Sequence, residues 1–181
     1  MQRLIPGAIA ALASIAAPAA MAQLLPSCPG AYSPAAWTNC VGTHTFPNGG
    51  TYAGEFKDGK RNGRGAMAFP NGERYEGAYR DGDRNGAGTL TLSNGEKYVG
   101  EFKNGRYDGQ GALAFPDGSS YAGDFRNGRI SGRGTFTFAD GAKYVGEVWN
   151  GKLNGQGVEY RTDGTILRAG VWENGLFVRR Q

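Results

Sequence analysis

The chain has 181 residues, a formal net charge of +4 and 32 glycines. Glycine and proline together make up 40 residues, a share that by itself is typical of low-complexity chains. Three tryptophans, nine tyrosines and nine phenylalanines oppose that interpretation, because aromatic side chains supply large apolar area for a core. One histidine and two cysteines exclude multi-histidine and thiolate zinc sites, and so small a charge argues against a nucleic-acid partner.

The first 22 residues have the features of a secretory signal peptide. Arg3 supplies positive charge, an uncharged run rich in Ala, Ile and Leu follows, and Ala20-Met21-Ala22 is a cleavage pattern of small residues. A membrane-spanning anchor needs about 20 strongly apolar residues. This run is mostly Ala and is interrupted by prolines, so cleavage is favoured over anchoring. We therefore expect export to the periplasm or beyond, with cleavage between Ala22 and Gln23.

Residues 23–40 form an N-terminal cap segment that contains both cysteines, Cys28 and Cys40. An even pair of cysteines in an exported protein predicts a disulfide. The alternative is a lipobox at Leu25–Cys28, with Cys28 carrying a lipid anchor. Gln23 separates that motif from the apolar run, Pro26 fits it poorly, and Cys40 would lack a partner. The disulfide is the favoured of the two interpretations.

Residues 41–181 are organised by a period of 23 residues. A tyrosine recurs at this spacing and is called position 0 of each repeat; a glycine follows at position 2, and an aromatic residue or Val at position 4. The position-0 residues are Tyr52, Tyr75, Tyr98, Tyr121 and Tyr144, and the position-4 residues are Phe56, Tyr79, Phe102, Phe125 and Val148. Five glycine columns with the same period hold 25 of the 32 glycines, so the glycine excess is periodic.

Each repeat is predicted to contain two short strands. Alternation in Tyr52–Lys57 places every second side chain on one side, and Ala66–Phe69 forms the second strand. Asp58-Gly59 and Asn71-Gly72 are turn dipeptides. Because three glycines fall at positions 7–13, we expect a loop there rather than a tight hairpin. The expected fold is all-β, an elongated single-layer antiparallel meander of stacked 23-residue hairpins with about eleven strands.

The array is expected to have incomplete units at both ends. Val41–Gly49 matches only the second half of a unit and is taken as a half repeat. Five full repeats follow. One extra residue then precedes Gly170–Gly175, which resembles the start of a sixth unit and is predicted to be a cap.

The pattern Y-x-G-x-F-x-x-G-x-x-x-G-x-G resembles the MORN repeat (membrane occupation and recognition nexus) over roughly residues 41–176. The resemblance implies an elongated antiparallel sheet of stacked hairpins. It also implies scaffolding or protein interaction, with homodimers in some members and phospholipid binding proposed for others. Members that are lipid kinases or a histone methyltransferase carry a separate catalytic domain. No such domain is expected here, so neither activity is carried over.

The sequence predicts no catalytic, cofactor or metal site. Gly54–Lys60 matches the start of a phosphate-binding P-loop, but Arg61 stands where that motif needs Ser or Thr. The same glycine spacing recurs in every repeat, which favours a structural role. We therefore expect no enzymatic activity.

The expected function is non-catalytic binding or scaffolding of a protein partner at a bacterial-type cell envelope. A single-layer sheet cannot bury both faces, so part of the aromatic ladder is expected to line an open groove, with hydroxyls toward solvent. The candidate partner contacts are Tyr52, Tyr75, Tyr98, Tyr121, Tyr144, Phe56, Tyr79, Phe102 and Phe125.

A mixed-charge face is expected on the other side of the sheet. One row is acidic and a second is basic, formed by Glu55, Glu101, Asp124 and Glu147 and by Lys57, Arg80, Lys103 and Arg126 respectively. The alternative function is peripheral binding to anionic phospholipid. It is less favoured because a membrane-binding surface needs a one-sided basic patch, whereas basic and acidic residues alternate along each repeat.

Overall fold

The computed structural model describes residues 25–180, so the predicted signal peptide and its cleavage point lie outside the described residues. Thirteen strands occur in this part of the chain, and each pairs antiparallel with its neighbours in chain order. They are β1 Cys40–Thr45, β2 Thr51–Lys57, β3 Lys60–Ala68, β4 Arg74–Arg80, β5 Asp83–Thr91, β6 Lys97–Lys103, β7 Arg106–Ala114, β8 Ser120–Arg126, β9 Arg129–Thr137, β10 Lys143–Trp149, β11 Lys152–Tyr160, β12 Ile166–Glu173 and β13 Leu176–Arg180.

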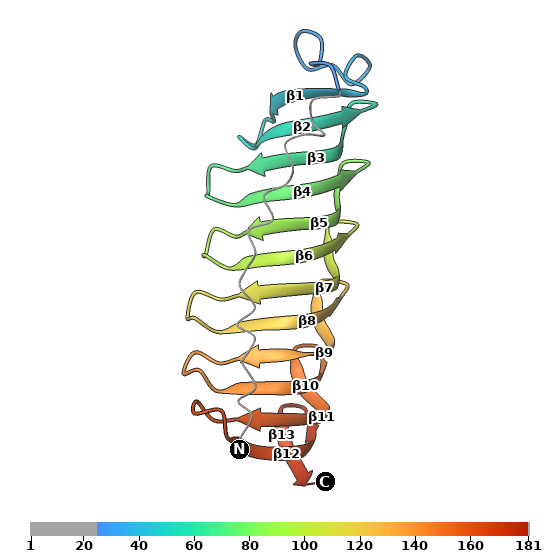
Figure 1. Ribbon diagram of the computed structural model, residues 1–181. Coiled ribbons are helices and arrows are strands. Elements are labelled where there is room, and N and C mark those ends of the chain that lie inside the picture. Colours follow the sequence, from blue (N-terminus) through green and yellow to red (C-terminus); the bar gives the residue numbers. More distant parts are fainter. Residues whose placement is uncertain (1–24, 181) are drawn as a thin grey trace, which may run out of the picture.

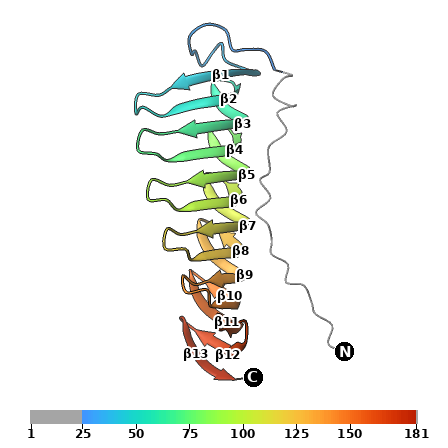
Figure 2. The same ribbon diagram turned by 60° about the vertical axis from the view of Figure 1, so that its left-hand side comes forward.

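The strands stack like rungs along one axis and form a single open meander (Figure 1). Figure 2 shows the same stack from a second direction, in which the connecting loops line up along one side. The all-β meander expected from the repeats is therefore confirmed. Within residues 25–180, the structure contains no helix that is long and apolar enough to span a membrane.

The hairpins are tighter than the sequence suggested. β3 runs unbroken from Lys60 to Ala68, so positions 8–13 are strand, and the turn consists only of Asp58-Gly59. Both turn residues have positive φ, 50° and 69°, as a two-residue type I′ hairpin turn requires. The register between β2 and β3 shifts between Gly54 and Phe56. This β-bulge accommodates the unequal strand lengths. The expected loop at positions 7–13 is therefore wrong.

A row of glycines crosses the sheet from β1 to β12. Gly54 of β2 pairs with Gly65 of β3, which also pairs with Gly77 of β4, and the series continues strand by strand. Its members are Gly42, Gly54, Gly65, Gly77, Gly88, Gly100, Gly111, Gly123, Gly134, Gly146, Gly157 and Gly170. A tyrosine ring covers this row in each repeat. A Cβ added at Gly111 would lie 2.6 Å from a ring carbon of Tyr98.

The core is a ladder of aromatic rings above the glycine row. Tyr75 lies 5.0 Å from Tyr79 of its own repeat and 5.0 Å from Phe102 of the next, measured between ring centroids, and both contacts are edge-on. Tyr98 makes the same two contacts with Phe102 and Phe125. Edge-on packing is the preferred geometry for aromatic pairs. Each repeat therefore stabilises the next through one shared ring.

The tyrosine hydroxyls of position 0 are directed into the backbone. Tyr98 Oη donates a hydrogen bond to the carbonyl oxygen of Glu101 at 2.9 Å, and the other four tyrosines make the equivalent bond. Glu101 is the residue that the register between β6 and β7 skips. Burial raises the pKa of Tyr121 and Tyr144 to about 12. The expectation that these hydroxyls face solvent is therefore wrong.

The N-terminal cap takes the place of a missing repeat. Cys28 and Cys40 form the predicted disulfide. Trp37 is buried and packs edge-on against Phe56, with ring centroids 4.8 Å apart. The backbone N–H of Gly59 donates to the carbonyl oxygen of Trp37 at 2.8 Å. In the following repeats, the turn glycine donates in the same way to the preceding repeat.

The C-terminal end is closed by a complete hairpin, β12–β13. Trp172 is buried and packs edge-on against Tyr144, with ring centroids 5.1 Å apart. It takes the position that the position-4 ring of the next repeat occupies elsewhere in the array. Phe177 of β13 packs against Trp172 at 4.8 Å. The hairpin therefore covers the last tyrosine of the ladder.

The contact between tyrosine and glycine can be tested with Gly111→Ala. Gly111 has no positive φ, so the new methyl group acts through its collision with Tyr98 rather than through backbone strain. We expect a net loss of about 1–3 kcal/mol in the free energy of unfolding, measured by chemical denaturation. The control is Ala112→Val in the same strand, where other repeats have Thr or Val. It should change stability by less than about 0.5 kcal/mol. Equal effects of the two substitutions would contradict the proposed packing.

Candidate binding surfaces

The nine ring residues named from the sequence as partner contacts form the buried floor of the array. Their side chains are at most 4% exposed. The position-0 rings lie against the glycine row, and the position-4 rings separate them. A partner resting on this side of the sheet would therefore meet the side chains that flank the rings.

Two columns of half-buried side chains flank the buried rings and carry different chemistry. The position-17 column is apolar as far as Phe138 and ends in Arg161, and the position-9 column changes from basic to aromatic to aliphatic along the array. We call the surface between them the inner groove. The half-buried members of the first column are Phe46, Phe69, Leu92 and Phe115, and the second column consists of Arg61, Arg84, Tyr107, Ile130 and Leu153.

The repeat period alone does not identify the position-9 column as part of a binding surface. A repeat is recognised at positions where the residue type is constant, whereas position 9 is Arg in the first two repeats and then Tyr, Ile and Leu. The available signal was its pairing with position 4, because the register sets Phe102 opposite Tyr107 and Phe125 opposite Ile130. The Tyr107 ring is nearly parallel to Tyr98, with centroids 3.8 Å apart.

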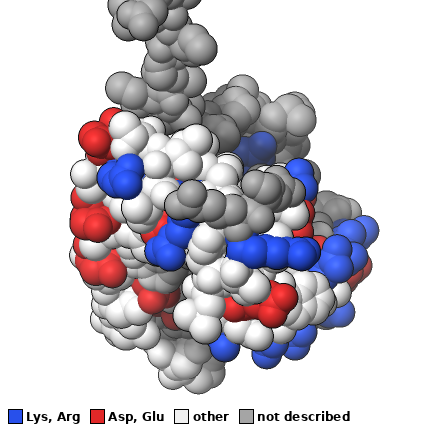
Figure 3. All heavy atoms as spheres, turned by 90° about the horizontal axis from the view of Figure 1, so that it is seen from below, with Lys and Arg blue, Asp and Glu red and all other residues white. Residues whose placement is uncertain are grey.

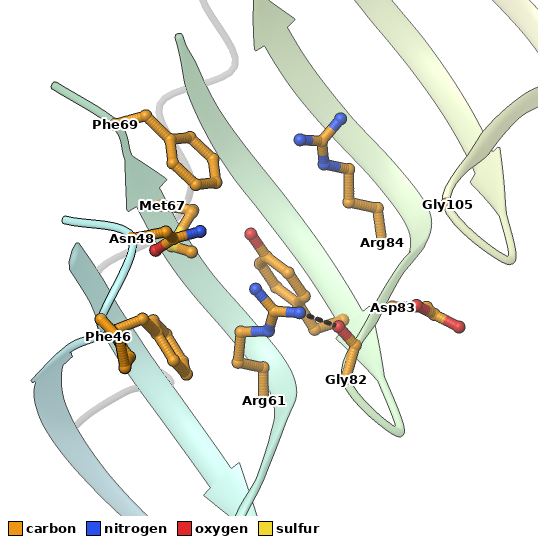
Figure 4. Close-up of a pocket in the computed structure, with 11 residues that line it drawn as sticks. Phe46, Asn48, Arg61, Met67, Phe69, Gly82, Asp83, Arg84 and Gly105 are labelled. Atoms are coloured by element: carbon orange, nitrogen blue, oxygen red, sulfur yellow. Dashed lines mark hydrogen bonds between the residues drawn. The ribbon is translucent and has the colours of Figure 1, made fainter. Parts of the chain in front are cut away.

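A pocket of about 630 Å³ opens at the N-terminal end of the inner groove (Figure 4). Phe46 and Phe69 stand on one side of it, and Arg61 and Arg84 approach from the other. The Arg61 guanidinium lies 5.6 Å from the centroid of the Phe46 ring and 5.4 Å from that of Tyr79. Its Nη2 also donates to the carbonyl oxygen of Gly82 at 2.6 Å, so the guanidinium is held in place.

Arg84 has a carboxylate partner inside the groove. Its Nη2 lies 2.8 Å from Oε1 of Glu73, and both side chains are about one quarter exposed. The guanidinium also lies 5.1 Å from the centroid of the Tyr75 ring. The two arginines therefore differ: the charge of Arg84 is compensated by a neighbour, whereas that of Arg61 rests against two rings and a carbonyl oxygen.

The acidic row on the outer face is partly engaged by the protein's own backbone. The Glu55 carboxylate accepts a hydrogen bond from the backbone N–H of Arg64 at 3.0 Å. Asp124 accepts one from Arg133 in the equivalent place at 2.8 Å, and Arg133 also forms an ion pair with Glu147. These carboxylates stabilise the bulged hairpins, so they are less available for docking than a free row would be.

The basic row lies at the edge of the sheet that carries the Asp-Gly and Asn-Gly turns. Across these turns the register pairs Lys103 with Arg106 and Arg126 with Arg129, which adds a second basic row. We call this edge the basic strip; its members are all exposed, and they are Lys57, Lys60, Arg80, Lys103, Arg106, Arg126, Arg129 and Lys152.

Folding separates charges that alternate in the sequence. Among the ion pairs formed by residues 25–180, none includes a member of the basic strip. Seen from the β13 end in Figure 3, acidic atoms gather along one side and basic atoms toward the other. The net positive charge of the strip is lower at the first two turns, which contain Asp58, Asp81 and Asp83. The later turns have Asn in place of the turn Asp. The alternation seen in the sequence therefore does not argue against a one-sided basic surface.

Comparison with solved structures finds matches of low sequence identity and low TM-score. The TCP domain of Drosophila melanogaster SAS-4 (dCPAP), solved in complex with a proline-rich motif of Ana2, is 15% identical over 67% of this chain and 73% of that one, with a TM-score of 0.40. The G-box domain of the microcephaly protein CPAP is 20% identical over 70% and 67%, with a TM-score of 0.46. Comparison with curated protein sequences gives no match.

The sequence profile of the MORN repeat matches five consecutive segments of 23 residues. They are 52–74, 75–97, 98–120, 121–143 and 144–166, and they follow one another without a gap. Each begins at a position-0 tyrosine and contains the glycines on which that ring lies. The chain belongs to the MORN repeat family.

Proposed function

We propose that this protein is a non-catalytic binding module whose inner groove receives an extended segment of a protein partner. The observation that carries the proposal is the strip of half-buried apolar side chains supported by a rigid aromatic floor. Phe69, Leu92, Phe115, Ile130 and Leu153 each pack against the buried core and keep part of their surface in solvent.

The shape and chemistry of the groove suit a polypeptide better than a small molecule. The pocket at its N-terminal end is open, and the two columns continue beyond it over several repeats. Apolar and aromatic residues next to a few charged groups are typical of the centres of protein interfaces. Because the floor is held by ring-to-ring contacts, the groove needs little rearrangement to bind, which limits the entropic cost of association.

This function can be tested by selecting random 12-residue peptides, displayed on phage, against the purified protein. We expect selected peptides to bind the groove, and Phe115→Glu to weaken their binding at least tenfold by placing a charge in the apolar wall. The matched control is Val145→Glu on the outer face, where the Val side chain is already 43% exposed. It should change affinity less than about twofold. Thermal melts of both variants establish that they are folded.

Failure to select any peptide would remove the support for a peptide groove. Equal losses of affinity in Phe115→Glu and Val145→Glu would place the binding surface elsewhere.

A second candidate function, peripheral binding to an anionic membrane surface, is favoured by the basic strip. Repeats are about 10 Å apart, two strand spacings, so the strip presents basic groups at regular intervals along one edge. Each Lys or Arg near an anionic bilayer contributes about 1 kcal/mol to binding. Exposed basic groups without carboxylate partners are suited to this interaction.

Flotation with phosphatidylglycerol-containing vesicles tests the second function. We expect binding to weaken with salt and to fall by more than about tenfold in the double variant Lys103→Glu/Arg106→Glu, because both charges lie on the strip. The control Lys97→Glu/Lys143→Glu makes the same charge change near the opposite edge of the sheet. Equal losses in both variants would indicate a response to net charge, and absence of flotation would exclude the function.

We also propose that the protein is exported and that its mature form acts in an oxidising envelope compartment. The disulfide supports this proposal, because such bonds persist outside the reducing cytosol. It also occupies the Cys28 thiol that a lipid anchor would need. N-terminal sequencing of the mature protein should begin at Gln23, and mass analysis without reductant should show the cross-link. A mature chain that begins at a lipid-modified Cys28 would contradict this assignment.

A further inference from the structure

Tyr79 carries a buried hydroxyl that the fold leaves unused. It occupies position 4, where Phe56, Phe102 and Phe125 stand in other repeats, and its side chain is 4% exposed. Among the buried side-chain polar atoms of residues 25–180, its hydroxyl is the one without a hydrogen-bond partner. Leaving a buried donor unpaired destabilises a fold. A phenylalanine at this position would fill the same space without the cost of a buried, unpaired donor.

The hydroxyl belongs to a residue that lines the pocket in Figure 4, and Arg61 lies beside it. A guanidinium has five N–H donors. Gly82 accepts from Nη2 of Arg61, and the remaining N–H groups can serve a ligand. Arg61 takes part in none of the ion pairs found within residues 25–180. The pocket therefore combines a fixed positive charge with an unpaired hydroxyl.

We propose that this pocket binds the carboxylate of an acidic side chain in the polypeptide that occupies the inner groove. The proposal rests on the peptide-binding function proposed above and names one feature of the partner. Arg61 and the Tyr79 hydroxyl donate to the two carboxylate oxygens, a charge-assisted arrangement. Phe46 and Phe69 contact the apolar stem of the same side chain.

The charges around the pocket favour a carboxylate over a phosphate. Arg84 is already paired with Glu73, and Asp83 also lines the pocket, so the two arginines and the two carboxylates sum to zero charge. Arg61 is the arginine of the pocket that has no ion-pair partner among residues 25–180. One unpaired arginine suits the single charge of a carboxylate, whereas a phosphate dianion would be repelled more strongly by the two acidic neighbours. The groove continues past the pocket toward Leu92 and Phe115, which suits an internal side chain rather than a chain terminus.

The peptides selected in the phage experiment provide the probe. We expect them to share an Asp or Glu at one aligned position, flanked by apolar residues. Replacing that acid by its amide in a fluorescein-labelled peptide should weaken binding at least tenfold, measured by fluorescence anisotropy. In Arg61→Gln the acidic and amide peptides should bind equally. Arg106→Gln on the basic strip is the charge-matched control and should keep the preference for the acid.

Tyr79→Phe separates a binding role from a structural one. Because the hydroxyl has no internal partner, this variant should be at least as stable as the natural protein. Its affinity for the acidic peptide should fall about fivefold, the worth of one hydrogen bond. Tyr75→Phe is the matched control, because it removes a hydroxyl that donates to the carbonyl oxygen of Ala78 at 2.9 Å. It should lose stability and keep the preference for the acid.

Glu73→Gln provides an independent gain-of-binding test. It frees the Arg84 guanidinium beside the pocket, so the acidic peptide should bind several times more tightly. Unchanged or weaker binding of the acidic peptide to this variant would contradict the electrostatic assignment.

The remaining outcomes separate this proposal from the function it rests on. Peptides that bind the groove with no shared acid, or that keep their acid preference in Arg61→Gln, would overturn the carboxylate pocket and leave the groove function standing. Failure to select any groove-binding peptide would overturn both. Displacement of the acidic peptide by inorganic phosphate, but not by acetate at equal ionic strength, would assign the pocket to a phosphate group instead.

Discussion

The packing of each position-0 tyrosine against paired glycines is the contact on which this array depends. A single sheet has no second layer to cover its face, so its core must be built from side chains lying against their own backbone. Tyr98 does this over Gly111, where any larger residue would collide with the ring. Its hydroxyl then reaches the carbonyl oxygen of Glu101 at the bulge, so the ring, the glycines and the bulge form one unit.

Repetition of that unit explains why the array is continuous and why both ends need special treatment. Each position-4 ring contacts the tyrosine before it and the tyrosine of its own repeat, so a repeat is complete only when its neighbours are present. At the first repeat, Trp37 from the disulfide-linked cap packs on Phe56. At the last, Trp172 packs on Tyr144. Tryptophan supplies in one side chain the area that an absent repeat would have covered.

Constant and variable positions have divided roles in this protein. Positions 0, 2, 4 and 13 determine the fold and are buried or lie beneath a ring. Position 9 is free to vary because its side chains rest above the rings, and it changes from Arg61 through Tyr107 to Leu153 along the groove. Tyr79 is the exception among the constant positions. It adds a polar group to a column that is otherwise apolar, at the place where an uncompensated arginine also lies.

The repeat period alone determined the strand count to within two and the antiparallel order, because both follow from residue spacing. The pairing of Cys28 with Cys40 was predicted separately, from the even number of cysteines in an exported chain. The tight turn at Asp58-Gly59 was not predicted, because three glycines at positions 7–13 indicated a loop. Only the tertiary structure decided which side chains reach the surface. The bulge after Gly54 and the glycine row let the tyrosine rings lie flat, and this placed the most regular aromatic residues out of a partner's reach. Cross-strand register likewise gathered Lys103, Arg106 and their equivalents at one edge. Register and bulges join residues from different strands, so a pattern read along one strand does not contain them.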